Sequence, residues 1–113
     1  MVRQLLDSET AVMDESVAKP IAIGIPWYTR ETYPDILNIM EDASTFPARF
    51  EDWLARAEAT ERQIENEGTA VVRAFIDPEE FSLWCRAHGL RVDAAARGRF
   101  ASETALKALR NAH

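Results

Sequence analysis

Two short runs of strand-forming residues constrain this chain most, because each is followed by a proline-containing turn that can open a helix. The first run, IAIGI at residues 21–25, alternates isoleucine with the small residues Ala22 and Gly24, as a strand with one apolar face requires. Pro20 and Pro26 bracket it and predict a strand of limited length. The small face leaves room for a helix or another backbone to approach closely.

The second run, TAVVRAFI at residues 69–76, is rich in β-branched residues and nearly apolar on both sides. It predicts a strand covered on both faces. Asp77 then provides the N-cap of a helix, Pro78 takes its first position, and Gly89 ends it. Asp93 is the expected cap of a last helix that runs toward Asn111.

Two further helices are predicted between the strands. Thr32 is the expected N-cap of a short helix that ends near Asp42. Thr45 is the expected cap of a longer helix, which Pro47 opens and Gly68 closes. Apolar residues recur along this longer helix at helical spacing, so one of its faces belongs to the core.

The order β-α-α-β-α-α indicates a mostly helical α/β fold, a two-layer single domain over residues 20–113. The length of 113 residues fits one domain. Residues 1–19 show no clean period and are interpreted as a loosely ordered N-terminal arm. Because two strands alone make a poor sheet, we expect either a third strand from the arm or pairing of sheets across a dimer.

The charge of the chain is unevenly distributed. With 13 bases and 19 acids, the net charge is 13 − 19 = −6. Residues 1–85 hold 7 bases and 17 acids, or −10, whereas residues 86–113 hold 6 bases and 2 acids, or +4. This asymmetry favours two halves or two subunits that face each other, and the acidic total disfavours nucleic acid as a partner.

The expected compartment is the cytoplasm. Cys85 is the single cysteine and cannot form an internal disulfide, which is typical of a reducing environment. The first residues, MVRQLLDSETAVMDE, contain no apolar run of signal-peptide length. No run elsewhere is long and apolar enough to predict a membrane span.

Three motifs carry a resemblance to known sequences: PWY, W-L-x-x-A-E and W-C-x-x-x-G-L-x-x-D-x-x-A-R. Together they make residues 22–105 similar to a group of small uncharacterised bacterial proteins. The resemblance implies a stand-alone soluble bacterial protein. It implies no activity, cofactor or catalytic residue.

The turn after the first strand is the best candidate for a ligand-binding site. Trp27, Tyr28 and Tyr33, with Arg30 nearby, can stack a planar ligand beyond the carboxyl end of a strand. His88 is the further polar group assigned to this site. The alternative is that these rings simply pack under the neighbouring helix.

Cys85 and His88 lie three residues apart on one helix and could form a thiolate–imidazole pair or two metal ligands. A metal needs three or four ligands, and no second Cys–His group completes the set. The simpler interpretation is a core cysteine beside Phe81 and a histidine that complements the helix dipole. We therefore predict no metal site, no cofactor and no catalytic residue.

Residues 81–96 also mimic a helix-turn-helix, with Gly89 in the turn. The second helix would present Arg91, Arg97 and Arg99 to phosphates. The acidic total and Gly98 inside the supposed recognition helix speak against nucleic-acid binding.

The last helix is predicted to contact a second subunit. At about 100° per residue, Leu106 and Leu109 share a stripe that faces away from Phe100. A ridge of small residues on this helix would let another helix approach: Ala101, Ala105, Ala108 and Ala112.

The sequence thus favours a non-enzymatic interaction or regulatory module, acting as a homo-oligomer or on a protein partner. The alternative is a small-molecule binder or enzyme that uses the turn of residues 27–33 with nearby His and Arg groups.

Overall fold

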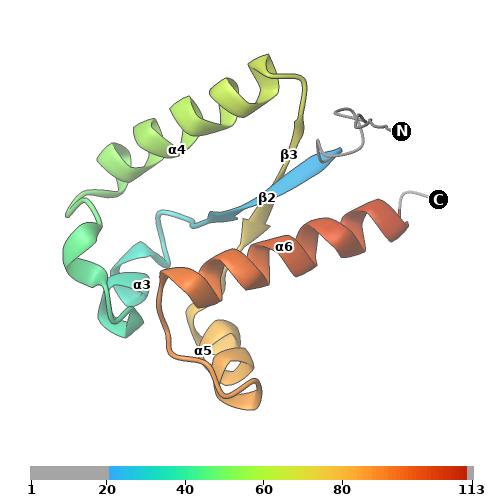
Figure 1. Cartoon of the computed structure of the whole chain (residues 1–113). Helices are drawn as coiled ribbons and strands as arrows, with labels where there is room; N and C mark the ends of the chain where they lie inside the picture. The colour runs from blue at the N-terminus through green and yellow to red at the C-terminus, as the bar shows by residue number, and fades with distance from the viewer. Residues whose placement is uncertain (1–20, 112–113) are drawn as a thin grey trace, which may run out of the picture.

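The computed structural model describes residues 21–111 and has the predicted α/β class and β-α-α-β-α-α order (Figure 1). The predicted N-terminal arm, and any third strand that it supplies, lie outside these residues. The elements follow each other as β2 (Ala22–Trp27), α3 (Tyr33–Ile39), the 3₁₀ turn η1 (Ala43–Thr45), α4 (Phe50–Asn66), β3 (Ala70–Phe75), α5 (Pro78–Ala87) and α6 (Ala94–Asn111).

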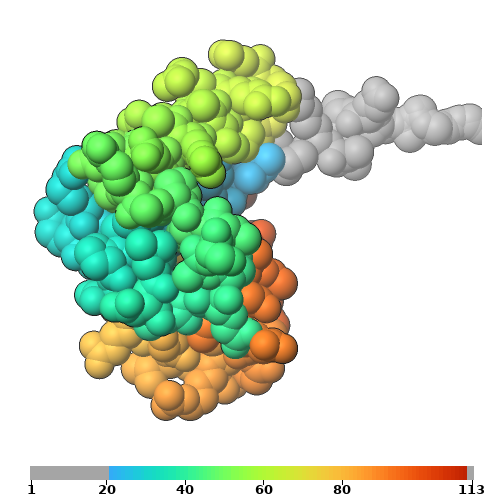
Figure 2. Space-filling model, turned by 90° about the vertical axis from the view of Figure 1, so that its left-hand side faces the viewer, coloured from blue at the N-terminus to red at the C-terminus, as the bar shows by residue number. Residues whose placement is uncertain are grey.

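The two strands pair in parallel, with Ala22 opposite Ala70 and Trp27 opposite Phe75. The connection between them passes through α3 and α4, as a parallel crossover must. Figure 1 shows α4 on one side of the sheet and α6 on the other, so helices cover both faces and the two layers predicted become three. Seen from the side in Figure 2, the segment from α3 to α4 forms one continuous surface above α5 and the start of α6.

The small face of β2 lies against α6. Ala101 and Ala105 are buried, and a side chain on Gly24 would overlap the backbone of Ala101. The predicted close approach of a helix to this face is therefore confirmed. It also corrects the prediction that Ala101 and Ala105 contact a second subunit, because the sheet of the same chain covers them.

The prediction that Pro26 ends the first strand is wrong, since β2 continues to Trp27. The carbonyl groups of Ile21 and Trp27 accept hydrogen bonds from Ala70 and Ile76 of the β3 side. Because backbone groups alternate along a strand, the nitrogen of Pro26 points to the opposite edge of β2. No strand within residues 21–111 pairs with this edge, which we call the open edge. Its missing N–H therefore removes no bond from the sheet.

The predicted start of the longer helix is also wrong. α4 begins at Phe50 after Arg49, and its N-cap forms no side-chain hydrogen bond. Thr45 belongs to η1 instead, where its hydroxyl donates to the Asp42 carbonyl at 2.8 Å. The Thr45 hydroxyl thus forms a local hydrogen bond instead of the helix cap that the sequence pattern predicted. The predicted end is correct, since Gly68 follows the helix with a φ of 89°.

The short helix α3 ends at Ile39, before the predicted end at Asp42. Thr32 precedes it, but its hydroxyl pairs with the Thr29 hydroxyl at 2.8 Å instead of capping the helix. Ile36 and Met40 from this region enter the core.

The predicted residues that cap the start of α5 and α6 and that end α5 are confirmed. The Asp77 carboxylate accepts from the Glu80 amide and the Asp93 carboxylate from the Ala96 amide, each at 3.0 Å. At the end of α5, the Leu90 amide donates to the Cys85 carbonyl at 2.8 Å, and Gly89 has a φ of 65°. This is the predicted Schellman-like stop.

The core lies between the aromatic turn, α3 and α5, with Ile36, Phe81 and Cys85 at its centre. At the end of β3, Ala74 is buried, but Phe75 is 56% exposed. The prediction that both faces of this strand are covered is therefore wrong at Phe75.

Candidate functional site

The aromatic turn folds inward. Trp27, Tyr28 and Tyr33 are all buried. They pack with the ring of Phe46, which follows η1, and with rings of α4. The Trp53 ring lies with its centroid 4.8 Å from that of Tyr28 and 5.3 Å from that of Trp27. Phe50 meets Tyr33 edge to face at 5.7 Å. Such pairs stabilise a core beyond the area that they bury.

The Trp27 ring also contacts a charged side chain. The Arg73 guanidinium lies 4.0 Å from the ring centroid. It also donates two hydrogen bonds to the Glu61 carboxylate on α4, at 2.8 and 2.7 Å. Glu61 thus holds Arg73 over the ring, a cation–π arrangement.

Arg30 lies at the rim of this cluster. Its guanidinium is 4.9 Å from the centroid of the Phe50 ring and pairs with Glu51. The Tyr33 hydroxyl donates to the Pro47 carbonyl at 2.6 Å and joins the turn to the segment before α4. Burial raises the pKa of Tyr33 above its ordinary value.

His88 is not brought to the aromatic turn. It follows α5, where its ring lies 4.5 Å from that of Trp84 and its Nδ1 donates to the Trp84 carbonyl at 2.8 Å. The structure thus assembles Trp27, Tyr28 and Tyr33 and leaves His88 at the end of another element. Ligand binding by this residue set stays a prediction.

Cys85 lies in the core, and burial raises the pKa of its thiol. Within residues 21–111, no group of three or more His, Cys, Asp or Glu side chains could hold a metal ion.

The arginines of the supposed recognition helix are paired with carboxylates of the same chain. Arg97 donates to both Asp42 oxygens at 2.8 and 2.9 Å, and this hydrogen bonding lowers the pKa of Asp42. Arg91 pairs with Glu41, and Arg99 with Glu103. These pairs leave few free cations for phosphates on this helix.

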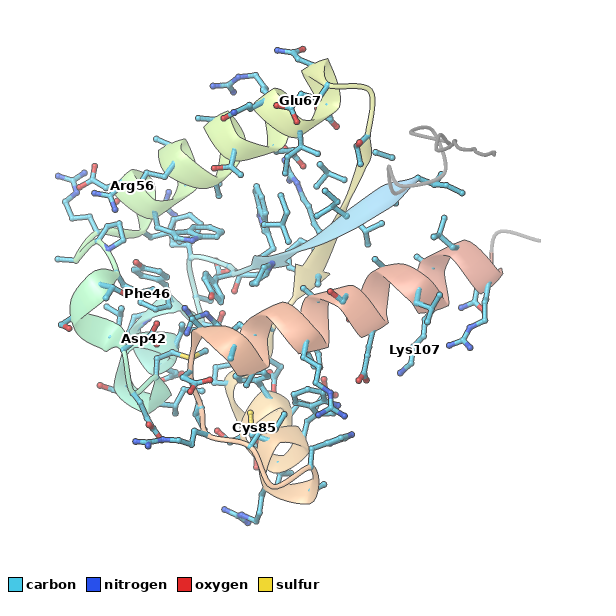
Figure 3. The ribbon with its side chains drawn as sticks, viewed as in Figure 1. Asp42, Phe46, Arg56, Glu67, Cys85 and Lys107 are labelled. Atoms are coloured by element: carbon cyan, nitrogen blue, oxygen red, sulfur yellow. The ribbon has the colours of Figure 1, made fainter. Side chains whose placement is uncertain are left out.

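A shallow cleft opens where η1, α4 and α6 meet the aromatic turn. Figure 3 shows Asp42 and Phe46 near the N-terminal end of α6, with Arg56 on α4. The volume of the cleft is about 290 Å³. We call it the Tyr28 cleft, and its lining residues are Pro26, Tyr28, Thr45, Phe46, Pro47, Trp53, Arg56 and Arg97.

Of this lining, the sequence assigned only Tyr28 to the aromatic turn, and it assigned Arg97 to a phosphate-facing helix instead. Arg56 and Arg97 were missed as members of this cleft because they come from helices far from the turn in sequence. The available signal was the set of three motifs: PWY contributes Tyr28, W-L-x-x-A-E contributes Trp53, and the last motif ends on Arg97. Folding brings these three segments to one place.

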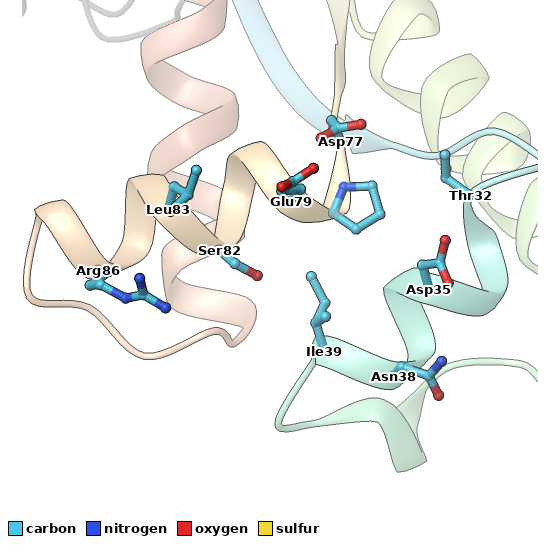
Figure 4. Close-up of a pocket in the computed structure, with 10 residues that line it drawn as sticks. Thr32, Asp35, Asn38, Ile39, Asp77, Glu79, Ser82, Leu83 and Arg86 are labelled. Carbon is cyan, nitrogen blue, oxygen red and sulfur yellow. The ribbon is translucent and has the colours of Figure 1, made fainter.

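A wider cavity of about 600 Å³ lies between α3 and α5. Figure 4 shows Asp35 and Ile39 on one wall, and Glu79, Ser82 and Arg86 on the other. The carboxylate of Asp77, at its upper end, already caps α5. Local structure thus explains the position of this carboxylate without a ligand.

A third hollow, of about 390 Å³, lies between β2 and the C-terminal half of α6. We call it the β2–α6 groove. Its polar lining is limited to Ser102 and backbone, and its residues are Ala22, Ile23, Gly24, Ser102, Ala105, Leu106 and Leu109. Leu106, on its wall, is 52% exposed.

The fold and these hollows define a small, mostly helical α/β domain built around a parallel pair of strands. Residues 32–111 match the family model described as a domain of unknown function (DUF8829), so the chain belongs to that family. No curated protein and no solved structure matches the chain significantly. None of the helices within residues 21–111 is long and apolar enough to span a bilayer.

Proposed function

We propose that this protein is a non-enzymatic interaction or regulatory module that acts as a homo-oligomer, in which a second copy covers the β2–α6 groove. The observation that carries the proposal is the groove itself, an apolar hollow with an exposed leucine on its wall. Exposed apolar surface of this kind marks interaction sites on small domains. A bacterial cytoplasm is part of the proposal, in keeping with the single cysteine.

Within residues 21–111 no strand pairs with the edge of β2 that faces away from β3, and this edge supports an interaction at this place. The backbone of Ala22 and Gly24 points away from β3, because the alternate residues Ile23 and Ile25 face that strand. A two-stranded sheet is barely stable alone, and an open edge favours further contacts. Ile21, at the start of this edge, is 77% exposed.

The shape of the β2–α6 groove and its surroundings favours a second copy over an unrelated partner. This surface contains both a hollow and the projecting side chain of Leu106, so Leu106 of each copy can enter the groove of the other. A two-fold interface needs such self-complementarity. Each buried leucine would contribute about 2 kcal/mol.

Charge favours the same arrangement. Among residues 21–111, neither Lys107 nor Arg110 takes part in an ion pair. These two cations flank Leu106 and Leu109 on α6, while residues 1–85 carry a net charge of −10 from 7 bases and 17 acids. The basic end of one copy can therefore approach the acidic body of the other.

Light scattering after size-exclusion chromatography tests the proposal. We expect twice the monomer mass for the wild type at micromolar concentration, and the monomer mass for Leu106→Glu, because the interface would bury an unpaired charge. Leu83→Glu is the matched control, since Leu83 is 53% exposed but lies on α5, outside the groove. A monomeric wild type, or a dimer that persists in Leu106→Glu, would contradict the proposal.

A further inference from the structure

Tyr28 carries a hydroxyl that forms no hydrogen bond with any of the described residues, although its side chain is buried. The residue is only 4% exposed, yet no residue within 21–111 exchanges a hydrogen bond with its hydroxyl. The nearby Tyr33 hydroxyl, by contrast, donates to the Pro47 carbonyl at 2.6 Å. An unsatisfied buried hydroxyl is costly, so a polar group is expected to meet it from the cleft that Tyr28 lines.

The hydroxyl is suited to donate, not to ionise. Burial raises the pKa of Tyr28 to about 12, so the phenol keeps its proton at neutral pH. Its natural partner is therefore an acceptor, and an anionic acceptor makes the stronger bond.

The charges around the cleft also favour an anion. Both charged residues of its lining, Arg56 and Arg97, are cations, and no carboxylate lines it. Asp42 neutralises Arg97 from outside the lining and holds its guanidinium 4.8 Å from the centroid of the Phe46 ring. Arg56 has no ion pair among the described residues, so one positive charge is available at the mouth.

The remaining walls are apolar and flat, formed by the rings of Phe46, Pro47 and Trp53. The cleft, with a volume of about 290 Å³, can hold a small organic molecule. It is too small for a nucleotide or for a cofactor as large as a nucleotide. A ligand that contacts both the polar groups and the apolar rings of the cleft has one acidic group and a compact apolar body.

We propose that the Tyr28 cleft binds a small carboxylic acid with an apolar, planar body. The carboxylate accepts hydrogen bonds from the Tyr28 hydroxyl and the Arg56 guanidinium, and the body lies against Phe46 and Trp53. Arg97, fixed by Asp42, forms the floor on the α6 side. The site lies at the N-terminal end of α6 and is independent of the β2–α6 groove at the other end.

The test is a titration of the ¹⁵N-labelled full chain with benzoate, followed by the amide and indole N–H resonances. We expect saturable shifts at Tyr28, Phe46 and the Trp53 indole, and no comparable shifts with the neutral isostere benzamide. Inorganic phosphate, an anion without an apolar body, is expected to bind more weakly than benzoate.

Variants separate recognition from folding. Tyr28→Phe removes only a hydroxyl that has no hydrogen-bond partner within residues 21–111, so the spectrum should stay native while benzoate binds at least about tenfold more weakly. Arg56→Gln should weaken binding similarly, and Arg62→Gln, on the same helix but outside the cleft, should bind as the wild type does. Three results would overturn the proposal: no benzoate shifts at millimolar concentration, equal binding of benzamide or phosphate, or unchanged affinity in Tyr28→Phe.

Discussion

A Cβ atom on Gly24 would overlap the carbonyl oxygen of Ala101, so β2 and α6 are in contact backbone to backbone. The same atom would lie 3.2 Å from the Cβ of Ala105. This close approach sets the distance of α6 from the sheet and thereby forms one wall of the β2–α6 groove. A glycine on a strand is used here for the room that it leaves, not for its backbone freedom.

The first prediction follows from this contact. Gly24→Ala should lower the free energy of unfolding by about 2–3 kcal/mol, because the helix backbone must shift to admit the methyl group. Gly98→Ala, within α6, is the matched control, since nothing lies within 4 Å of its added Cβ. It should raise stability by about 1 kcal/mol through helix propensity. Chemical denaturation measures both, and a Gly24→Ala protein as stable as the wild type would show that α6 is not seated as described.

The second prediction concerns the two tyrosines, Tyr28 and Tyr33, which are the only ones in the chain. Burial raises the pKa of both, that of Tyr28 to about 12. The folded state therefore favours the neutral phenols. The stability that this preference contributes is complete below about pH 10, where unfolded tyrosine titrates. It is lost as the pH rises through the raised pKa of each tyrosine, which for Tyr28 is about 12.

Absorbance at 295 nm, which reports tyrosinate, measures this directly. The native protein should show less phenolate at pH 10 than the denatured chain, which should be half ionised there, because the pKa of both tyrosines is raised in the folded state. Half-ionisation of the native protein near pH 10 would place the rings in water and contradict their burial.

The short-range signals of the sequence predicted the elements well. Asp77 and Asp93 cap the helices that follow them, and Gly89 ends α5, because each signal acts within a few residues of itself. The errors arose where another group competed for the same atoms. Thr45 bonds to Asp42 instead of capping α4, and Pro26 is tolerated in β2 only because its nitrogen faces the open edge.

The candidate site was predicted less completely, for a physical reason. Tyr28 could be selected from its own turn, but Arg97 reaches it from a helix 69 positions later in the chain. Contacts of this kind depend on how α6 lies against β2. The small face of β2 predicts that a helix approaches it, but not which helix or which side chains it brings to the turn. The pairing of Arg97 with Asp42 was missed for the same reason.

The third prediction is that Cys85 is inert in the native state. Its thiol is buried, and burial raises its pKa, so little thiolate is available at neutral pH. Labelling with a thiol reagent should be slow until denaturant is added. Fast labelling of the folded protein would mean that α5 opens readily or that the cysteine is not in the core.

The last prediction concerns self-association through the β2–α6 groove, and amide hydrogen exchange at two protein concentrations tests it most directly. The amides of Ala22 and Gly24, which point to the open edge, and those around Leu106 should exchange more slowly as the concentration rises from below to above the association range. The same amides of Leu106→Glu should exchange equally at both concentrations. Protection that stays unchanged at this edge, or that appears on α3 and α5 instead, would contradict the account.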